Sequence, residues 1–191
     1  MVVPFRAGGK SRLPPEIRAE IALAMLGDVV EAAVEVGDTR VVTDDPAGRL
    51  VATALGAEAV DDPGTGQGAA VAAALAGVEG ICLVVNADLP RVRPSDLGAL
   101  AVPARLGAVA VVEAADGTTN ALGLPLAEVF RPLYGPGSAG RFRAHAAALD
   151  LRSEGLALPN LIDDVDTLAD LERVGVHGGP RTRALLQAIA P

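Results

Sequence analysis

The segment that most constrains the fold is a short apolar run that ends abruptly in polar residues. Residues 81–85 are almost continuously apolar, which is typical of a strand buried on both faces of a parallel sheet. Asn86, Asp88 and Pro90 follow, and they cannot extend such a strand. Ligands bind beyond the carboxyl ends of strands in open α/β sheets, so Asp88 lies where a site is expected. A carboxylate there can bind a hard cation such as Mg²⁺, or it can simply cap a loop before a helix.

Strand and helix patterns alternate along the rest of the chain. Short apolar runs predict strands at residues 2–5, 39–43, 57–60 and 108–112. Helices are predicted at residues 15–29, 47–55, 69–76, 95–100, 141–149, 168–174 and 180–190. The alternation is typical of a three-layer α/β/α fold with a mostly parallel, mixed sheet, to which residues 121–124 and 156–158 are expected to add an antiparallel edge. No repeat or low-complexity linker interrupts the 191 residues, so a single domain over 1–191 is predicted.

Composition excludes several classes of protein. The net charge of -8 argues against a partner made of long nucleic acid, which needs a basic face. Cys82 is the single cysteine, so intrachain disulfides and a cysteine zinc cluster are excluded. No apolar run reaches membrane-spanning length, and the first five residues are too short for a signal core. We therefore expect a cytoplasmic protein without a membrane partner.

A glycine-rich loop with basic side chains follows the first predicted strand. It contains Gly8, Gly9, Lys10, Ser11 and Arg12. Lys10 is the only lysine among 16 basic residues, which suggests that a compact ammonium group is needed there. The triplet resembles the end of a Walker A loop, but Pro4 occupies the position of the required first glycine, which disfavours a P-loop. In this loop Lys10 would bind phosphate as a point charge and Arg12 as a planar fork.

Other polar signals lie near the ends of predicted strands. Gly66, Gln67 and Gly68 begin an Ala-rich helix, an arrangement that favours an anion or a planar ligand. Asn120 follows two threonines in a predicted turn, and a rigid loop of small residues covers positions 134–138. Asp164 precedes a helix that Asp166 or Thr167 is expected to cap. Together with the Lys10 loop, these are the parts of a nucleotidyl transfer site, namely a basic loop for a triphosphate and carboxylates for Mg²⁺.

The order of these motifs resembles the 2-phospho-L-lactate guanylyltransferase family, whose actinobacterial members use phosphoenolpyruvate. The matching motifs are K-S-R-L at 10–13, A-D-L-P at 87–90, G-T-x-N-A-L at 117–122, Y-G-P-G-S at 134–138 and D-V-D-T-x-x-D-L at 164–171. The A-D-L-P motif is common among nucleotidyltransferases, whereas the Y-G-P-G-S loop is more specific. The resemblance covers about residues 2–171. It implies a nucleotide-sugar-transferase-like fold and a role in biosynthesis of the deazaflavin coenzyme F-420.

The resemblance also implies roles for individual residues. Asp88 and Asp164 match the Mg²⁺-binding carboxylates, and Gly135 and Ser138 match the loop that holds the phosphorylated acid. The predicted acid site comprises Thr119, Asn120, Gly135, Gly137, Ser138 and Arg141. The predicted nucleotide site comprises Gly8, Gly9, Lys10, Gly66, Gln67 and Gly68. The predicted catalytic residues are Lys10, Arg12 and Asp88. Many members have His after the matching Arg, but this chain has Phe142, and the nearest His is His145.

The predicted reaction is attack of a substrate phosphate oxygen on the α-phosphorus of GTP, with pyrophosphate leaving in line. Because this nucleophile is already an anion, no general base is required. Catalysis would then consist of positioning and of charge neutralisation by Mg²⁺, Lys10 and Arg12.

Two other functions stay open at this point. One is another nucleotidyltransferase of the same fold, of the molybdopterin or sugar-phosphate type. The other is a non-catalytic nucleotide-binding regulatory domain. The sequence also leaves open the choice between phosphoenolpyruvate and 2-phospho-L-lactate, the choice of GTP over other nucleotides, and whether the chain forms a homodimer.

Overall fold

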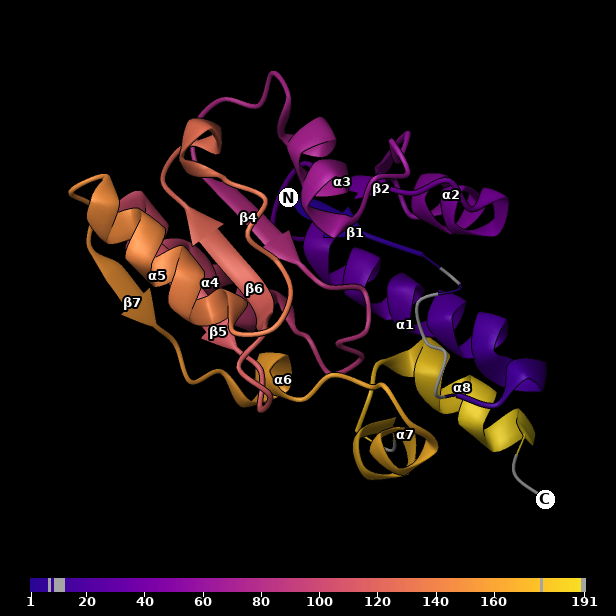
Figure 1. Cartoon of the computed structure of the whole chain (residues 1–191). Coiled ribbons are helices and arrows are strands. Elements are labelled where there is room, and N and C mark those ends of the chain that lie inside the picture. The colour runs from indigo at the N-terminus through magenta and orange to yellow at the C-terminus, as the bar shows by residue number, and fades with distance from the viewer. Residues whose placement is uncertain (7, 9–12, 176, 190–191) are drawn as a thin grey trace.

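The protein is built around one mixed sheet of seven strands. The computed structural model describes residues 1–6, 8, 13–175 and 177–189. The strand order is β3-β2-β1-β4-β6-β5-β7 (Figure 1). The strands are β1 (Val2–Pro4), β2 (Arg40–Val42), β3 (Glu58–Val60), β4 (Cys82–Val85), β5 (Val109–Glu113), β6 (Thr119–Leu124) and β7 (Ser153–Gly155). Among these strands β6 alone runs antiparallel to its neighbours, so the predicted mostly parallel sheet is confirmed.

The predicted antiparallel edge is wrong in its position: residues 121–124 do run antiparallel, but not at the edge, and residues 156–158 form no strand. Strand β6 lies inside the sheet, paired with β4 on one side and β5 on the other. All six of its residues are buried, which is typical of a strand covered on both faces and paired at both edges. The sheet ends instead at β7, which pairs in parallel with β5. Because β6 runs antiparallel to β4, its first residues, Thr119 and Asn120, lie beside the carboxyl ends of β1 and β4.

Helices cover both faces of the sheet and make the three-layer arrangement (Figure 1). One face packs against α1 (Pro15–Val34), α2 (Pro46–Ala54) and α4 (Pro94–Arg105). The other packs against α3 (Gln67–Leu75) and α5 (Ser138–Ala148). Helix α4 continues beyond its predicted end at Leu100 and includes Pro103. Its start is capped by Asp96, whose carboxylate accepts the Arg93 amide at 2.9 Å.

The two apolar clusters follow the alternation of side chains along the strands. Val3, Leu83 and Val85 face the layer of α1 and α4, whereas Cys82 and Val84 face the layer of α3 and α5. This is the period of two expected for extended chain, and it explains why residues 81–85 read as continuously apolar. The short helices η2 (Ala127–Val129) and α6 (Pro159–Ile162) lie in the connections around β6 and β7. None of the described helices is both long and apolar enough to cross a membrane.

The C-terminal helices α7 (Leu168–Gly175) and α8 (Pro180–Ile189) pack with α1 around a third, smaller apolar cluster. Asp28 of α1 is 4% exposed and accepts the amides of Arg181 and Thr182 at 2.9 Å each. A carboxylate in this position satisfies amides of the first turn of α8 and complements the helix dipole. Just before α8, the Gly179 amide donates to the Pro90 carbonyl at 2.6 Å. The C-terminal segment is therefore fixed beside the loop that carries Asp88.

Candidate functional site

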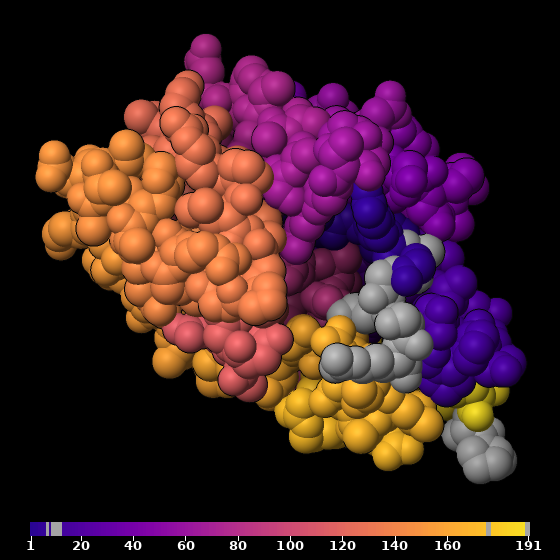
Figure 2. Space-filling view, viewed as in Figure 1, coloured from indigo at the N-terminus to yellow at the C-terminus, as the bar shows by residue number. Residues whose placement is uncertain are grey.

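The candidate site lies where the order of strands reverses. Strand β1 is flanked by β2 on one side and β4 on the other, so the carboxyl ends of β1 and β4 form a topological switch point. A cavity of about 240 Å³ opens there. It is lined by Pro4, Phe5, Arg6, Ala22, Met25, Asp62, Gln67, Ala70, Asn86, Ala87 and Asp88. Figure 2 shows the surface hollowed in this region, between the magenta atoms of the α3 region and the yellow C-terminal segment.

Three carboxylates meet at this edge of the sheet, and we call them the acid cluster: Asp88, Asp164 and Asp166. One oxygen of each lies within 4.8 Å of the others, and all three residues are half-buried. Asp88 follows β4, and the two others come from the segment between α6 and α7. The Val165 amide donates to the Asp88 carbonyl at 3.1 Å, which ties the two segments together. The acid cluster thus brings Asp88 together with two residues that lie at least 76 positions later in the chain.

The structure brings Asp88 and Asp164 together as the sequence predicted, and it adds Asp166. Of the two residues that the sequence offers as a cap for α7, Asp166 and Thr167, the cap is Thr167. The Thr167 hydroxyl accepts the Asp170 amide at 3.2 Å, and the Asp170 carboxylate accepts the Thr167 amide at 3.0 Å. Val165 is fully buried, and residues two apart in extended chain share a side. The spacing of Asp164 and Asp166 was therefore the signal that could have placed both carboxylates together.

The acid cluster fits a hard divalent cation by its donor chemistry. Carboxylate oxygens are the ligands that Mg²⁺ prefers, and two oxygens in one octahedral shell lie at most about 4.2 Å apart. The oxygens of the cluster lie within 4.8 Å of one another, slightly beyond this limit, so cation binding would draw the side chains closer together. Mg²⁺ usually takes one or two carboxylates and completes its shell with phosphate and water. Three carboxylates are therefore enough for such a cation.

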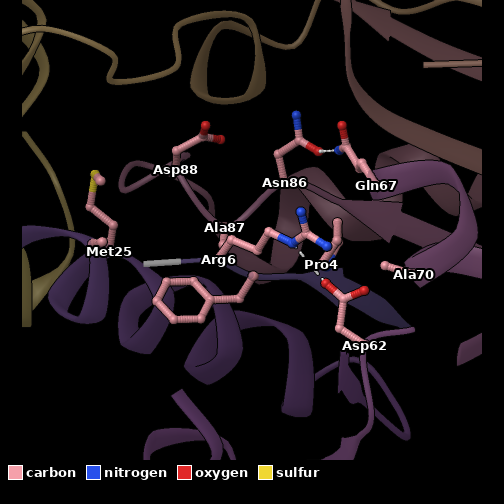
Figure 3. Close-up of a pocket in the computed structure, with 11 residues that line it drawn as sticks. Pro4, Arg6, Met25, Asp62, Gln67, Ala70, Asn86, Ala87 and Asp88 are labelled. Carbon is pink, nitrogen blue, oxygen red and sulfur yellow. Dashed lines mark hydrogen bonds and ion pairs between the residues drawn. The ribbon is translucent and has the colours of Figure 1, made fainter. Parts of the chain in front are cut away.

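A row of side-chain amides crosses the floor of the site. Gln67 Nε2 donates to Asn86 Oδ1 at 2.8 Å (Figure 3). Asn86 Nδ2 in turn contacts Asn120 Oδ1 at 3.5 Å. Asn120 is 2% exposed, and its Nδ2 donates to the Ile162 carbonyl at 2.9 Å. The row links the start of α3, the end of β4, the start of β6 and the segment that leads to Asp164. Asn120 thereby contacts neighbouring protein groups, whereas its predicted contact with the acid stays a prediction.

An ion pair that the sequence did not single out lines the same cavity. Arg6 Nε lies 2.9 Å from the Asp62 carboxylate, and the Asp62 side chain is 2% exposed (Figure 3). Burial alone would raise the pKa of Asp62, but the hydrogen bonds from Arg6 and from the Gly64 amide, together with the Arg6 charge, hold it below its ordinary value. Arg6 follows β1 and Asp62 follows β3, so their places at the carboxyl ends of strands were the available signal.

The predicted acid-binding loop, residues 134–138, leads into α5. Gly137 is the N-cap residue and adopts a left-handed conformation (φ 69°), which only glycine adopts readily. The Ser138 side chain is fully buried, and its Oγ lies 2.9 Å from Thr119 Oγ1. That hydroxyl pair joins the loop to the start of β6. The amides at the start of α5 are the groups suited to an anion at this end of the helix.

Arg141 braces the loop from within α5. Its guanidinium donates to the carbonyls of Leu133, Tyr134 and Pro136, with distances of 2.7 Å from Nη2 to Leu133 and 3.0 Å from Nη2 to Tyr134. A carbonyl and the following amide point in opposite directions along the chain, so this turns the amides of Tyr134, Gly135 and Gly137 away from Arg141. Within the described part of the chain the Arg141 side chain donates to carbonyls of residues 133–136, and its predicted contact with substrate stays a prediction.

Aromatic side chains support the same loop. The chain has only three Phe, one Tyr and no Trp, yet Phe130, Tyr134 and Phe142 form one cluster. The rings of Tyr134 and Phe142 meet edge to face at 5.3 Å. Burial raises the pKa of the Tyr134 hydroxyl. Phe142 is therefore part of the support for the loop, while His145 contacts the Val129 carbonyl through Nε2 at 3.0 Å.

The remaining predicted residues are the glycines at positions 8, 66 and 68 and a group that lies outside the described chain. Gly9, Lys10, Ser11 and Arg12 lie outside the described residues, and the roles predicted for them stay predictions. Gly8 is exposed. Gly66 is the N-cap residue of α3, with φ 112°. A Cβ on Gly68 would lie 2.5 Å from Pro132 Cβ, so glycine there permits close packing of α3 on that segment.

Comparison with known proteins assigns the chain to a family. Residues 7–158 match the family model described as the MobA-like NTP transferase domain. The phosphoenolpyruvate guanylyltransferase of Nocardia farcinica is 41% identical over 192 residues, which cover 93% of this chain and 83% of that protein. The chain belongs to the phosphoenolpyruvate guanylyltransferase family. The family member from Thermomonospora curvata is 39% identical over 202 residues, covering 97% of this chain and 87% of that protein.

Solved structures support the fold independently. A Desulfovibrio desulfuricans protein assigned to the nucleotide-diphospho-sugar transferases superposes with a TM-score of 0.77, covering 98% of this chain and 93% of that one. Its sequence identity is 16%, so the likeness shows the fold alone. The predicted nucleotide-sugar-transferase-like fold, the family and the nucleotidyltransferase class are confirmed.

Proposed function

We propose that the protein transfers GMP from GTP to the phosphate of phosphoenolpyruvate and releases pyrophosphate. The observation that carries the proposal is the acid cluster, at the switch point of a chain that belongs to this guanylyltransferase family. The relatives from Nocardia farcinica and Thermomonospora curvata, which match more than nine-tenths of the chain, bear the name phosphoenolpyruvate guanylyltransferase. The reaction would supply an intermediate of deazaflavin coenzyme F-420 biosynthesis in the cytoplasm, as the sequence resemblance implies.

The reaction requires positioning more than proton transfer. A phosphate oxygen of the acid, already an anion, forms a bond to the α-phosphorus of GTP while the bond from that phosphorus to the bridging oxygen breaks. Asp88, Asp164 and Asp166 would hold Mg²⁺, which, when bound, neutralises phosphate charge that would otherwise repel the nucleophile. Lys10 and Arg12 would contact the same phosphates.

The two substrates would approach from opposite sides of the acid cluster. The acid's phosphate or carboxylate would bind the amides of Gly135 and Gly137 beside the start of α5, and Arg141 keeps these amides in place through the preceding carbonyls. The nucleotide would lie along the cavity at the ends of β1 and β4, beside Gln67 and Asn86. This arrangement supports in-line approach of acid and triphosphate at the carboxylates.

The proposal is tested by following pyrophosphate release from the purified protein with Mg²⁺. We expect release from GTP with phosphoenolpyruvate, and less or none from CTP, UTP or ATP. 2-Phospho-L-lactate belongs in the same panel, because one sp² carbon separates the two acids. Asp88→Asn should abolish release while the thermal unfolding midpoint stays close to that of the wild type.

Two outcomes would replace the proposal. Pyrophosphate release with a sugar phosphate or a molybdopterin acceptor, but with neither acid, would indicate another nucleotidyltransferase of this fold. Tight GTP binding without release for any acceptor would indicate a regulatory nucleotide-binding domain. Sedimentation of the same preparation would decide whether a homodimer forms.

A further inference from the structure

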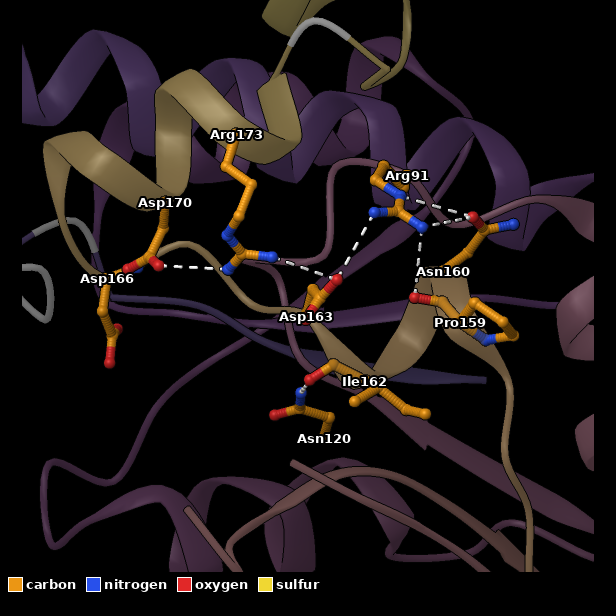
Figure 4. A network of polar contacts seen from close by, with 9 residues as sticks. All are labelled: Arg91, Asn120, Pro159, Asn160, Ile162, Asp163, Asp166, Asp170 and Arg173. Carbon is orange, nitrogen blue, oxygen red and sulfur yellow. Dashed lines mark hydrogen bonds and ion pairs between the residues drawn. The ribbon is translucent and has the colours of Figure 1, made fainter. Parts of the chain in front are cut away.

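Two arginines from different parts of the chain converge on one carboxylate beside the acid cluster. Arg91 Nη1 lies 3.4 Å from Asp163 Oδ2, and Arg173 Nη1 lies 3.2 Å from the same oxygen (Figure 4). The side chain of Arg91 is 20% exposed and that of Asp163 is 32% exposed, so this contact is partly shielded from solvent. Asp163 directly precedes Asp164, so the arginines fix the chain one residue away from the acid cluster.

Arg91 ties the loop of Asp88 to the segment of Asp164. It lies three residues after Asp88, and its guanidinium also reaches Asn160 Oδ1 at 3.3 Å and the Pro159 carbonyl at 3.3 Å. One side chain thus contacts both ends of α6. Asn160 is held from its other side, because its Nδ2 donates to Asp96 at 3.0 Å. Arg91 therefore keeps the two segments that carry the acid cluster in register with each other.

Arg173 holds the far end of the same segment. Its two terminal nitrogens divide between two carboxylates, Nη1 on Asp163 and Nη2 on Asp170, each at 3.2 Å. Asp170 Oδ2 accepts the Asp166 amide at 3.3 Å, and it also accepts the Thr167 amide and hydroxyl. Arg173 consequently connects the residue before Asp164 with the residue that fixes the backbone of Asp166. The planar guanidinium presents its two terminal nitrogens at a fixed spacing, so it sets the distance between the two carboxylates more rigidly than a lysine ammonium would.

We propose that Arg91 and Arg173 are positioning residues that hold Asp164 and Asp166 against Asp88 so that the acid cluster can bind a divalent cation. The inference rests on the proposed function, which assigns the cation to this cluster. Positive side chains near a cation site oppose cation binding by direct charge repulsion. Their presence here is explained if they act on the geometry of the segment, with Arg91 engaged by Asp163 and Arg173 engaged by Asp163 and Asp170.

Charge and geometry make opposite predictions for one substitution. Arg173→Gln removes a positive charge, which by electrostatics alone would tighten cation binding. If Arg173 sets the geometry, the same variant should weaken binding, by about tenfold. Arg173→Lys keeps the charge but loses the fork, so we expect it to weaken binding as well. Arg91→Gln should weaken binding for the same reason.

The test is titration of the full chain with Mn²⁺, without nucleotide, following the electron paramagnetic resonance signal of free Mn²⁺. Mn²⁺ accepts the same oxygen ligands as Mg²⁺. The matched control is Arg143→Gln, which breaks the Arg143–Glu113 ion pair away from the acid cluster and should leave binding unchanged. Thermal unfolding of each variant, read alongside, identifies loss of binding through loss of fold. If Arg173→Gln fails to fold, Arg173→Lys and Arg91→Gln carry the test.

The aspartate variants test the proposed cation site, and the arginine variants test the positioning role, so the two can fail separately. Loss of Mn²⁺ binding in Asp88→Asn and Asp164→Asn, with weakened binding in folded Arg91 and Arg173 variants, supports the inference. If the aspartate variants lose binding while Arg173→Gln and Arg173→Lys bind as well as the wild type or more tightly, the arginines are not positioning residues. If the wild type binds no Mn²⁺, or the aspartate variants bind it normally, the cation site itself is overturned, and this inference falls with it.

Discussion

Arginine side chains hold both segments that carry candidate site residues, but they contact different kinds of partner. In the acid-cluster segment, residues 159–170, Arg91 and Arg173 contact the carboxylates of Asp163 and Asp170. In the acid-binding loop, residues 134–138, Arg141 contacts backbone carbonyls. The first segment would hold a cation, and the second would hold the phosphorylated acid.

Because the partners differ, the two segments should respond differently to pH and salt. A carboxylate loses its charge in acid, and its ion pairs weaken when salt screens them. A backbone carbonyl carries no net charge and does not titrate. The geometry of the acid-cluster segment should therefore depend on pH, whereas the geometry of the acid-binding loop should not. Substitutions in the two segments should also affect different kinetic parameters. Those in residues 159–170 should lower turnover, and those in residues 134–138 should raise the KM for the acceptor.

The largest expected effect comes from the acid cluster. Asp164→Asn and Asp166→Asn should each lower turnover with GTP and phosphoenolpyruvate by about 10²-fold or more, because each removes charge from the site that would hold Mg²⁺. Steady-state kinetics with both substrates would measure this, with thermal unfolding as the control for folding. If Asp166→Asn turned over like the wild type, Asp166 would lie outside the working cation site despite its place in the cluster.

Arg141→Gln should have a smaller and more selective effect. Without the fork, the loop carbonyls lose their shared donor, and the amides that would bind the acid lose their orientation. We expect the KM for phosphoenolpyruvate to rise about tenfold, equivalent to about 1.4 kcal/mol, with little change in the KM for GTP. Arg141→Lys distinguishes the alternatives, because it would keep acid affinity if Arg141 bound the acid by charge. Equal loss of GTP affinity would mean that the loop serves the nucleotide or the fold.

Low pH should weaken the segment at residues 159–170, which is held through carboxylates. It should leave unchanged the loop at residues 134–138, which is held through backbone carbonyls. Burial alone would raise the pKa of Asp170, but hydrogen bonds from Thr167, Arg173 and the Asp166 amide hold it below its ordinary value. The pKa of Asp170 is therefore lower in the folded protein than in the unfolded chain. Its ionised carboxylate stabilises the fold above the ordinary pKa of about 4, and this stabilisation is lost as the pH falls through the folded-state pKa.

The corresponding measurement compares Asp170→Asn with the wild type in urea unfolding. The difference in unfolding free energy should be about 1 kcal/mol at neutral pH and should shrink below about pH 4. The same difference for Arg141→Gln should not vary over that range, since its partners are carbonyls. A pH-independent difference for Asp170→Asn would show that its hydrogen bonds do not depend on its charge.

The smallest effect is expected at Ser138. Ser138→Ala leaves the buried Thr119 hydroxyl without its partner, which should cost about 1 kcal/mol of stability. The KM for the acid should rise less than in Arg141→Gln, because the Ser138 side chain is buried against Thr119. Urea unfolding and acceptor kinetics together measure both. A large rise in KM without loss of stability would indicate that the hydroxyl contacts the acid directly.

Much of the fold and part of the site could be predicted from the sequence because the signals are local. Apolar runs and helical periodicity set the alternating elements, and carboxyl ends of parallel strands share one edge of a sheet, which placed Asp88 correctly. The order of short motifs identified the family. Glycine at position 137 indicated a turn that other residues adopt with strain.

Tertiary structure alone decided the rest, because those contacts join segments with no local signal for each other. The place of β6 inside the sheet depends on which strands pair, and it brings Asn120 to the site edge. Arg91 meets Asp163 from 72 residues away, and Asp28 caps α8 from 153 residues away. From its neighbours in the sequence Asp166 could have been a helix cap, and only the tertiary structure, in which the Val165 amide bonds to the Asp88 carbonyl, shows it in the acid cluster.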